Sequence, residues 1–271
     1  MSDHRPGTRV LGLTATCAAP VLYALWVRPR LLTWGATHEE TSGTYPGDEL
    51  IPDPAHSSTM ATTLPAPPER VWPWLVQMGY DRAGWYSWDK LDHSGKPSAD
   101  RIVPKWQNLQ QGQRLNSMAH GRDQMSVAVL EPVRTLVLRS IYQVPSFRTV
   151  EPRPGPAPRD CVDAIWGFHL RPAPGGKTRL VIRKRGRGPR AYTWPVNLLY
   201  DPLHFIMQTR QFHNLRTRVG AHVPLPPLQV ASQAHAGTVS VTAAVARAHG
   251  RYPGKDLGPW PERSRRCPLE G

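Results

Sequence analysis

The chain has 271 residues and carries 34 Lys and Arg residues against 20 Asp and Glu residues, a formal net charge of +14. This excess predicts an acidic partner. Thirty prolines exclude a long coiled coil or an all-helical bundle, because proline removes a helical hydrogen-bond donor. A hydrophobic content of 39% suffices for one core of roughly 150 residues with an extension at each end. Cys17, Cys161 and Cys267 are widely separated and odd in number, so they form neither a disulfide framework nor a CxxC metal site.

Residues 1–30 are an apolar N-terminal segment. Eighteen uncharged residues, from Val10 to Val27, are just enough to cross a bilayer core. No small-x-small cleavage site follows them, so an uncleaved membrane anchor is favoured over a secretory signal. The alternative is an apolar helix docked on the domain. We therefore expect a protein that is membrane-associated through this single segment, or cytoplasmic.

Residues 31–57 are predicted to be an acidic linker. Positions 36 to 58 hold five acidic residues and no Lys or Arg, and three prolines discourage regular structure. Later in the chain, positions 171 to 190 hold eight cations and no acid. Opposite charges in two segments suggest that the acidic segment folds back over the basic cluster. The acids are Glu39, Glu40, Asp48, Glu49 and Asp53.

From Ser58 to Gly220 the pattern is that of a folded domain. A strand ending at Leu64 precedes a helix that starts in the proline-rich 65–68 segment and ends at Gly79. A second short helix, Trp88 to His93, has Ser87 as its cap. Antiparallel strands then follow, separated by turns. They are predicted at Gln113–Met118, Met125–Leu130, Thr135–Ile141, Cys161–Leu170 and Lys177–Arg187, with a loop over 143–159.

Two of these strands have distinct faces. Along Cys161–Leu170 the even-numbered residues are apolar and predict a face toward a core or cavity. Along Lys177–Arg187 the odd-numbered residues are mostly cations, which predicts a solvated basic face able to contact an anionic surface. The residues expected to make that contact are Arg179, Arg183, Arg185 and Arg187.

The domain is expected to end in a long helix. Asp201-Pro202 is a strong helix start, and apolar residues recur at helical spacing as far as Gly220. Residues 221–271 are a Pro/Ala-rich basic extension with a short helix over 239–249. The order of elements predicts an α+β fold in which a curved antiparallel sheet wraps around the C-terminal helix and two short helices follow the first strand.

Seven segments of the chain carry a resemblance to a known family: Leu32–Thr37, Gly47–Leu50, Ala66–Gly79, Gly84–Asp89, Ser98–Ile102, Pro104–Gln107 and Asp201–Met207. They resemble the SRPBCC superfamily, the START/Bet v 1-like and polyketide cyclase/dehydrase-like proteins, in an actinobacterial-type subfamily. The resemblance covers about residues 31 to 220. It implies a helix-grip fold with an apolar pocket for a lipid, a polyketide or a similar molecule. Lys105 departs from the acidic residue expected before Trp106.

We expect the domain to bind a hydrophobic small molecule between the sheet and the C-terminal helix. Aromatic side chains supply rigid apolar walls with a few polar tips. The alternatives are a polyketide cyclase/dehydratase-type enzyme, a lyase or isomerase, and a protein-interaction module with a filled core. The expected wall residues are Trp74, Met78, Trp85, Tyr86, Trp88, Trp106, Trp166, Phe168, Phe205 and Phe212.

An enzyme of that type needs a general base and a cation beside an enolate. The candidates within the resembling segments are Tyr86, Asp89, Asp100, Arg101 and His204, each with an ordinary structural role as its alternative. No metal and no cofactor are expected, since no HExxH, P-loop, GxSxG or GxGxxG is present. The basic strand lacks interleaved aromatic residues, which argues against nucleic acid. The sequence leaves the oligomeric state open.

Overall fold

The computed structural model describes residues 22–118, 124–151 and 157–220. Most of the predicted anchor and the predicted helix over 239–249 therefore lie outside the described residues. Within the described ranges, no helix is both long and apolar enough to cross a bilayer.

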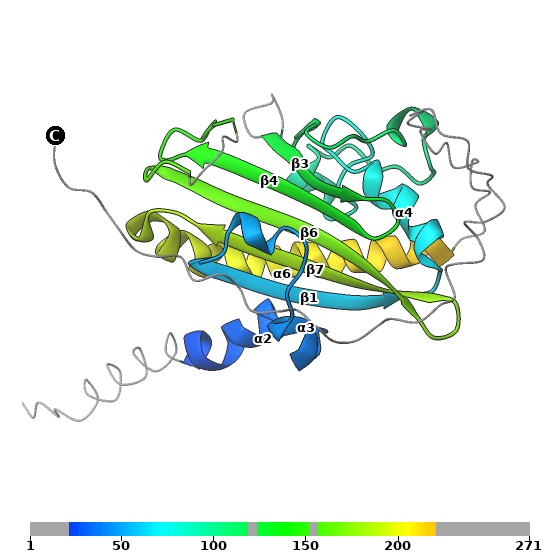
Figure 1. The fold of residues 1–271 in the computed structure, drawn as a ribbon, viewed down its shortest axis with the longest axis horizontal. Helices are drawn as coiled ribbons and strands as arrows, with labels where there is room; N and C mark the ends of the chain where they lie inside the picture. The colour runs from blue at the N-terminus through cyan, green and yellow to red at the C-terminus, as the bar shows by residue number, and fades with distance from the viewer. Residues whose placement is uncertain (1–21, 119–123, 152–156, 221–271) are drawn as a thin grey trace, which may run out of the picture. The chain divides into compact units, whose positions relative to one another are not determined.

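Seven antiparallel strands form one curved sheet in the order β1-β7-β6-β4-β3-β2, with β5 paired to β4 (Figure 1). They lie where the alternation of side chains predicts them, and the short β5 falls within the predicted loop. The bounds are β1 His56–Leu64, β2 Arg114–Asn116, β3 Gln124–Glu131, β4 Thr135–Gln143, β5 Arg148–Thr149, β6 Cys161–Ala173 and β7 Lys177–Arg187.

The helix α6, Arg190–Gly220, lies behind the sheet in Figure 1. It shares one apolar cluster with α4, Pro68–Val76, and with the even-numbered residues of β6 and β7. We call this side of the sheet the inner face. A second short helix, α5, follows at Asp89–Asp92, and a 3-10 turn, η3, at Pro104–Trp106. The sheet, the long C-terminal helix and the two short helices after β1 confirm the helix-grip fold.

Two helix predictions need correction. Ser87 does not cap α5, because its hydroxyl donates to the carbonyl oxygen of Met207 at 3.0 Å. The C-terminal helix begins at Arg190, eleven residues before the predicted start, and runs through Pro195 and Pro202.

A contact from the N-terminal region explains how α6 continues through Pro202. This proline has no N–H to donate to the carbonyl of Leu198 one turn earlier. The hydroxyl of Tyr23 donates to that oxygen instead, at 3.3 Å. Tyr23 belongs to a π-helical turn, η1 (Tyr23–Val27), which continues into α2, Arg28–Leu32.

The outer face of the sheet is also covered. The segment from α3, His38–Ser42, to the 3-10 turn η2, Asp48–Leu50, crosses this face in front of β7 and β6 (Figure 1). Tyr45 packs against Ala61 and Val181, and Ile51 packs against Val137 and Ile165. The expectation that this segment lacks regular structure is therefore wrong: it is a strap with two short helices, packed on the sheet by apolar side chains.

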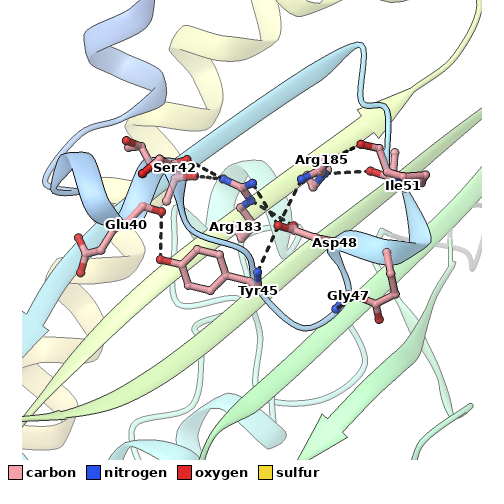
Figure 2. A network of polar contacts seen from close by, with 12 residues as sticks. Glu40, Ser42, Tyr45, Gly47, Asp48, Ile51, Arg183 and Arg185 are labelled. Atoms are coloured by element: carbon pink, nitrogen blue, oxygen red, sulfur yellow. Dashed lines mark hydrogen bonds and ion pairs between the residues drawn. The ribbon is translucent and has the colours of Figure 1, made fainter. Parts of the chain in front are cut away.

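Ion pairs fasten the strap to the sheet (Figure 2). The carboxylate of Asp48 lies 3.1 Å from Arg183 and 3.2 Å from Arg185, and Glu40 lies 2.7 Å from Arg179. The hydrogen bond from Arg179 lowers the pKa of Glu40. These contacts confirm that the acidic segment folds back over the basic cluster.

The predicted solvated basic face is wrong for the middle of β7, because Arg183 is only 7% exposed. Arg187 lies 3.6 Å from Asp163 on the neighbouring strand. Each arginine expected to contact an anionic surface thus already has an acidic partner within the chain. The strap, rather than an external anion, occupies this side of β7.

Candidate functional site

The apolar wall of the candidate site lies between the inner face of the sheet and α6. Six of the ten predicted wall residues are buried in one cluster there, and three more pack against it while partly exposed. Trp88 lies elsewhere: its ring is 44% exposed, with the guanidinium of Arg210 at 4.8 Å. The buried six are Trp74, Met78, Trp85, Tyr86, Phe168 and Phe212, and the other three are Trp106, Trp166 and Phe205.

Aromatic contacts join β6 to the loop after α4. The rings of Trp85 and Trp166 are 5.5 Å apart, and those of Trp166 and Phe168 are 4.7 Å apart. The indole Nε1 of Trp166 is buried without a hydrogen-bond partner among the described residues. A buried N–H that makes no hydrogen bond costs free energy, and most such groups in proteins have a partner. This donor therefore calls for an acceptor that the described part of the chain does not supply.

Two glutamines on the sheet-facing side of α6 bring further polar atoms into the cluster. Gln211 Nε2 donates to the backbone carbonyl of Trp85, and Gln208 Nε2 donates to Gln211 Oε1, both at 2.7 Å. Gln208 Oε1 is then left buried, with no donor to it in the described ranges. A chain of contacts from Trp166 through Trp85 and Gln211 to Gln208 has an unpartnered donor at one end and an unpartnered acceptor at the other.

The inner face becomes polar toward the first half of α6. Asp201 is buried and pairs with His56 on β1 and with Arg28 on α2, each at 2.7 Å. Burial alone would raise the pKa of Asp201, but the hydrogen bond and charge of His56, together with Arg28, outweigh it and lower that pKa. The carboxylate therefore stays ionised in the folded protein.

His204 lies one turn further along α6. Burial lowers its pKa well below the usual value, and the charges of Lys184 and His56 lower it further. Its ring stacks on Tyr200 with centroids 5.6 Å apart, and its Nε2 has no partner within the described residues. Lys184 donates to the Tyr200 hydroxyl at 2.9 Å. A neutral imidazole, a phenol and an ammonium group thus lie together at the polar end of the inner face.

The other predicted acid/base candidates are dispersed. Tyr86 is fully buried, its hydroxyl accepts from Gln77 at 2.7 Å, and burial raises its pKa. Asp89 accepts from the hydroxyl of Ser98 on the outside of the cluster. Asp100 and Arg101 are exposed. Of the five candidates, His204 is the one that the fold places among other ionisable groups of the inner face.

Sequence reasoning did not select His56, Lys184, Asp201, Gln208 or Gln211. A signal for Lys184 was present, because it continues the even-numbered positions of β7 that hold Leu180 and Ile182. It pairs in register with Trp166 on β6, so both side chains are on the inner face. For His56 no local signal exists, since its partner Asp201 lies 145 positions away.

Among the described residues, no group of His, Cys, Asp and Glu side chains is arranged to hold a metal ion.

Comparison with known proteins adds solved structures of low similarity. No protein-family model and no curated protein matches the sequence. The chain is similar to MLL2253 from Mesorhizobium loti, with 17% identity and a TM-score of 0.36 over 61% of this chain and 97% of that one. It is also similar to DynU16, from the dynemicin biosynthetic locus, with 16% identity and a TM-score of 0.35 over 60% of this chain and 48% of that one. CalU16 from Micromonospora echinospora is similar with 14% identity and a TM-score of 0.29 over 60% of this chain and 83% of that one. The helix-grip architecture therefore rests on the strand order and the helix of this chain itself.

Proposed function

We propose that the protein binds a hydrophobic small molecule, such as a lipid or a polyketide, between the inner face of the sheet and α6. The observation that carries the proposal is the pair of buried atoms, Trp166 Nε1 and Gln208 Oε1, that have no hydrogen-bond partner among the described residues and lie beside the apolar cluster. An apolar site with a few fixed polar groups is the usual design for small-molecule binding, because the apolar walls supply affinity and the polar groups supply orientation.

The two atoms also limit the chemistry of the ligand. Trp166 Nε1 only donates and Gln208 Oε1 only accepts, so a ligand that satisfies both carries an acceptor, such as a carbonyl, and a hydroxyl or amide donor. At the polar end, Lys184 favours a carbonyl, enolate or carboxylate oxygen. The proposed ligand is therefore a largely apolar molecule with oxygen substituents, rather than a pure hydrocarbon.

Native mass spectrometry of the full chain tests this proposal. We expect extra mass that disappears on denaturation and can be extracted and identified. Trp166→Phe and Gln208→Leu remove the two polar atoms at similar volume and should lower ligand occupancy. Thr217→Val, at an exposed position of α6, is the matched control. An empty protein that takes up no added lipid or polyketide would favour the interaction module with a filled core, with Trp166 and Gln208 hydrogen-bonded to water.

A second candidate function is an enzyme of the polyketide cyclase/dehydratase type, and the specific observation in its favour is the neutral His204. A neutral imidazole with a free nitrogen accepts a proton from a carbon between two carbonyl groups, and Lys184 would stabilise the enolate oxygen that forms. His204→Asn would then abolish turnover and leave ligand occupancy unchanged. Equal loss of both would assign His204 to binding or folding alone.

A further inference from the structure

In the first half of α6 the polar and apolar sides are exchanged relative to an ordinary surface helix, whose apolar side faces the core. Its sheet-facing side carries Asp201 and His204, whereas its solvent side is apolar. Positions 196, 199, 203 and 206 recur at three- and four-residue intervals, so they form one stripe along the helix. Leu199 is 81% exposed, and Trp194, which lies one turn before Leu198 and outside the stripe, is 69% exposed. The stripe residues are Val196, Leu199, Leu203 and Ile206.

The turn η1 adds a second apolar element beside this stripe. Tyr23 is hydrogen-bonded to Leu198, and Arg28 pairs with Asp201, so these contacts hold η1 and the start of α2 against the first half of α6. The neighbouring residues of η1 are apolar and exposed, and Trp26 is 59% exposed. We call Leu22, Leu25, Trp26 and Val27, together with Trp194 and the α6 stripe, the α6–η1 surface.

The charged residues of the two elements that form the α6–η1 surface are cations, apart from one buried acid. Residues 22–34 contain no acid, and the only acidic residue of α6 is the buried, paired Asp201. Cations are present at both elements: Arg30 lies 5.5 Å over the ring of Trp26, and Arg190 is exposed at the start of α6. An exposed apolar area of this kind marks an interaction site, and its cationic border matches a partner with negative charge.

We propose that the α6–η1 surface docks on an anionic lipid bilayer. Leucine and tryptophan side chains beside arginines are typical of interfacial membrane-binding helices, since the apolar groups enter the acyl boundary and the arginines contact the headgroups. The proposal is independent of ligand binding, because the stripe points away from the sheet.

The test measures the depth of single positions in a membrane. The full chain, with Cys17, Cys161 and Cys267 changed to Ala, receives Leu199→Cys and carries a nitroxide there. Met118→Cys is the matched control, because Met118 is 61% exposed and lies at the end of β2, the edge strand opposite β1. The probes are vesicles of phosphatidylcholine alone and vesicles with about one third phosphatidylglycerol, the range in which anionic lipid attracts basic surfaces.

We expect the nitroxide at position 199 to become accessible to oxygen and protected from a water-soluble nickel chelate on the anionic vesicles, while position 118 stays aqueous. If the protein binds vesicles but position 199 stays in water, residues 1–21 are a tether only and the proposal fails. If position 199 is already immobilised without vesicles, then the chain itself or a second copy covers the surface, and the proposal also fails.

The affinity of the protein for anionic vesicles provides a second test, independent of the nitroxide measurement. Leu199→Ser with Leu203→Ser should weaken binding to the anionic vesicles by about tenfold per residue, because each leucine loses the free energy of burial in the interface. Met118→Ser should leave binding unchanged. Equal binding by both variants would overturn the proposal, whatever the outcome of the ligand experiments.

Discussion

The two halves of α6 differ in which side of the helix is apolar and which is polar. In the second half, Phe212, Leu215 and Val219 face the sheet while His213 and Arg216 face solvent, as expected of a surface helix. In the first half the sheet-facing side is ionisable and the solvent side is apolar. The second half therefore anchors the helix by burial, whereas the first half contributes little hydrophobic anchoring.

The largest predicted loss of stability comes from a substitution in the second half of α6. Leu215 is fully buried, so Leu215→Ala should lower the free energy of unfolding by about 3 to 4 kcal/mol through lost burial and the cavity it leaves. Urea unfolding followed by circular dichroism measures it. A loss below about 1 kcal/mol would mean that the second half does not anchor the helix.

Asp201→Asn tests whether the first half is instead held by charge. Removing one partner of a buried ion pair leaves His56 and Arg28 uncompensated, so we expect a loss of about 2 to 3 kcal/mol at pH 7. Because the folded pKa of Asp201 is lowered, its contribution is present above the unfolded pKa and is lost as the pH falls below about 4. The stabilities of wild type and variant should therefore converge in acid, and a constant difference would contradict an ionic role.

His204 gives the first half a sensitivity to acid. Its folded pKa is lowered, so below about pH 6.5 the unfolded chain binds a proton that the folded protein does not, and stability falls by up to about 1.4 kcal/mol per pH unit. His169, on the outer face, also makes the folded protein less stable as the pH falls, because burial lowers its pKa to about 4. His204→Leu should reduce the slope of the unfolding free energy against pH by the contribution of one proton, measured by urea unfolding at a series of pH values.

The smallest effect is expected at the apolar stripe. Leu199→Ala should change the free energy of unfolding by less than about 0.5 kcal/mol, because the side chain is exposed in the folded protein. The same urea experiment as for Leu215→Ala measures it. A loss of several kcal/mol would show that the stripe is buried in solution, against another copy or another part of the chain.

The sequence predicted those parts of the fold that depend on local pattern. Alternation along Cys161–Leu170 located β6 and its apolar face, and the Pro-Gly-Gly turn located the β6–β7 hairpin. The same reasoning placed the start of α6 too late, because Pro202 is a helix-start signal whenever its local context alone is considered. The contact that lets the helix pass through Pro202 comes from Tyr23, 175 positions away in the chain.

The candidate site was predicted in its apolar half only. Aromatic residues are large and buried wherever they fall in a core, so their clustering between sheet and helix follows from composition and pattern. His56, Asp201 and Lys184 are ordinary polar residues in the sequence. They gain a role because strand register and helix packing bring β1, β7 and α6 together.

The sequence by itself determined the α+β class, the positions of the strands and the attraction between the acidic and basic segments, since periodicity and charge are properties of short stretches of chain. Only the tertiary structure decided that the basic strand is covered by the chain's own acids and that the first half of α6 turns its polar side inward. The reason is physical: a side chain's partners, burial and charge state depend on residues far away in sequence. Those contacts exist only once the sheet has closed around the helix.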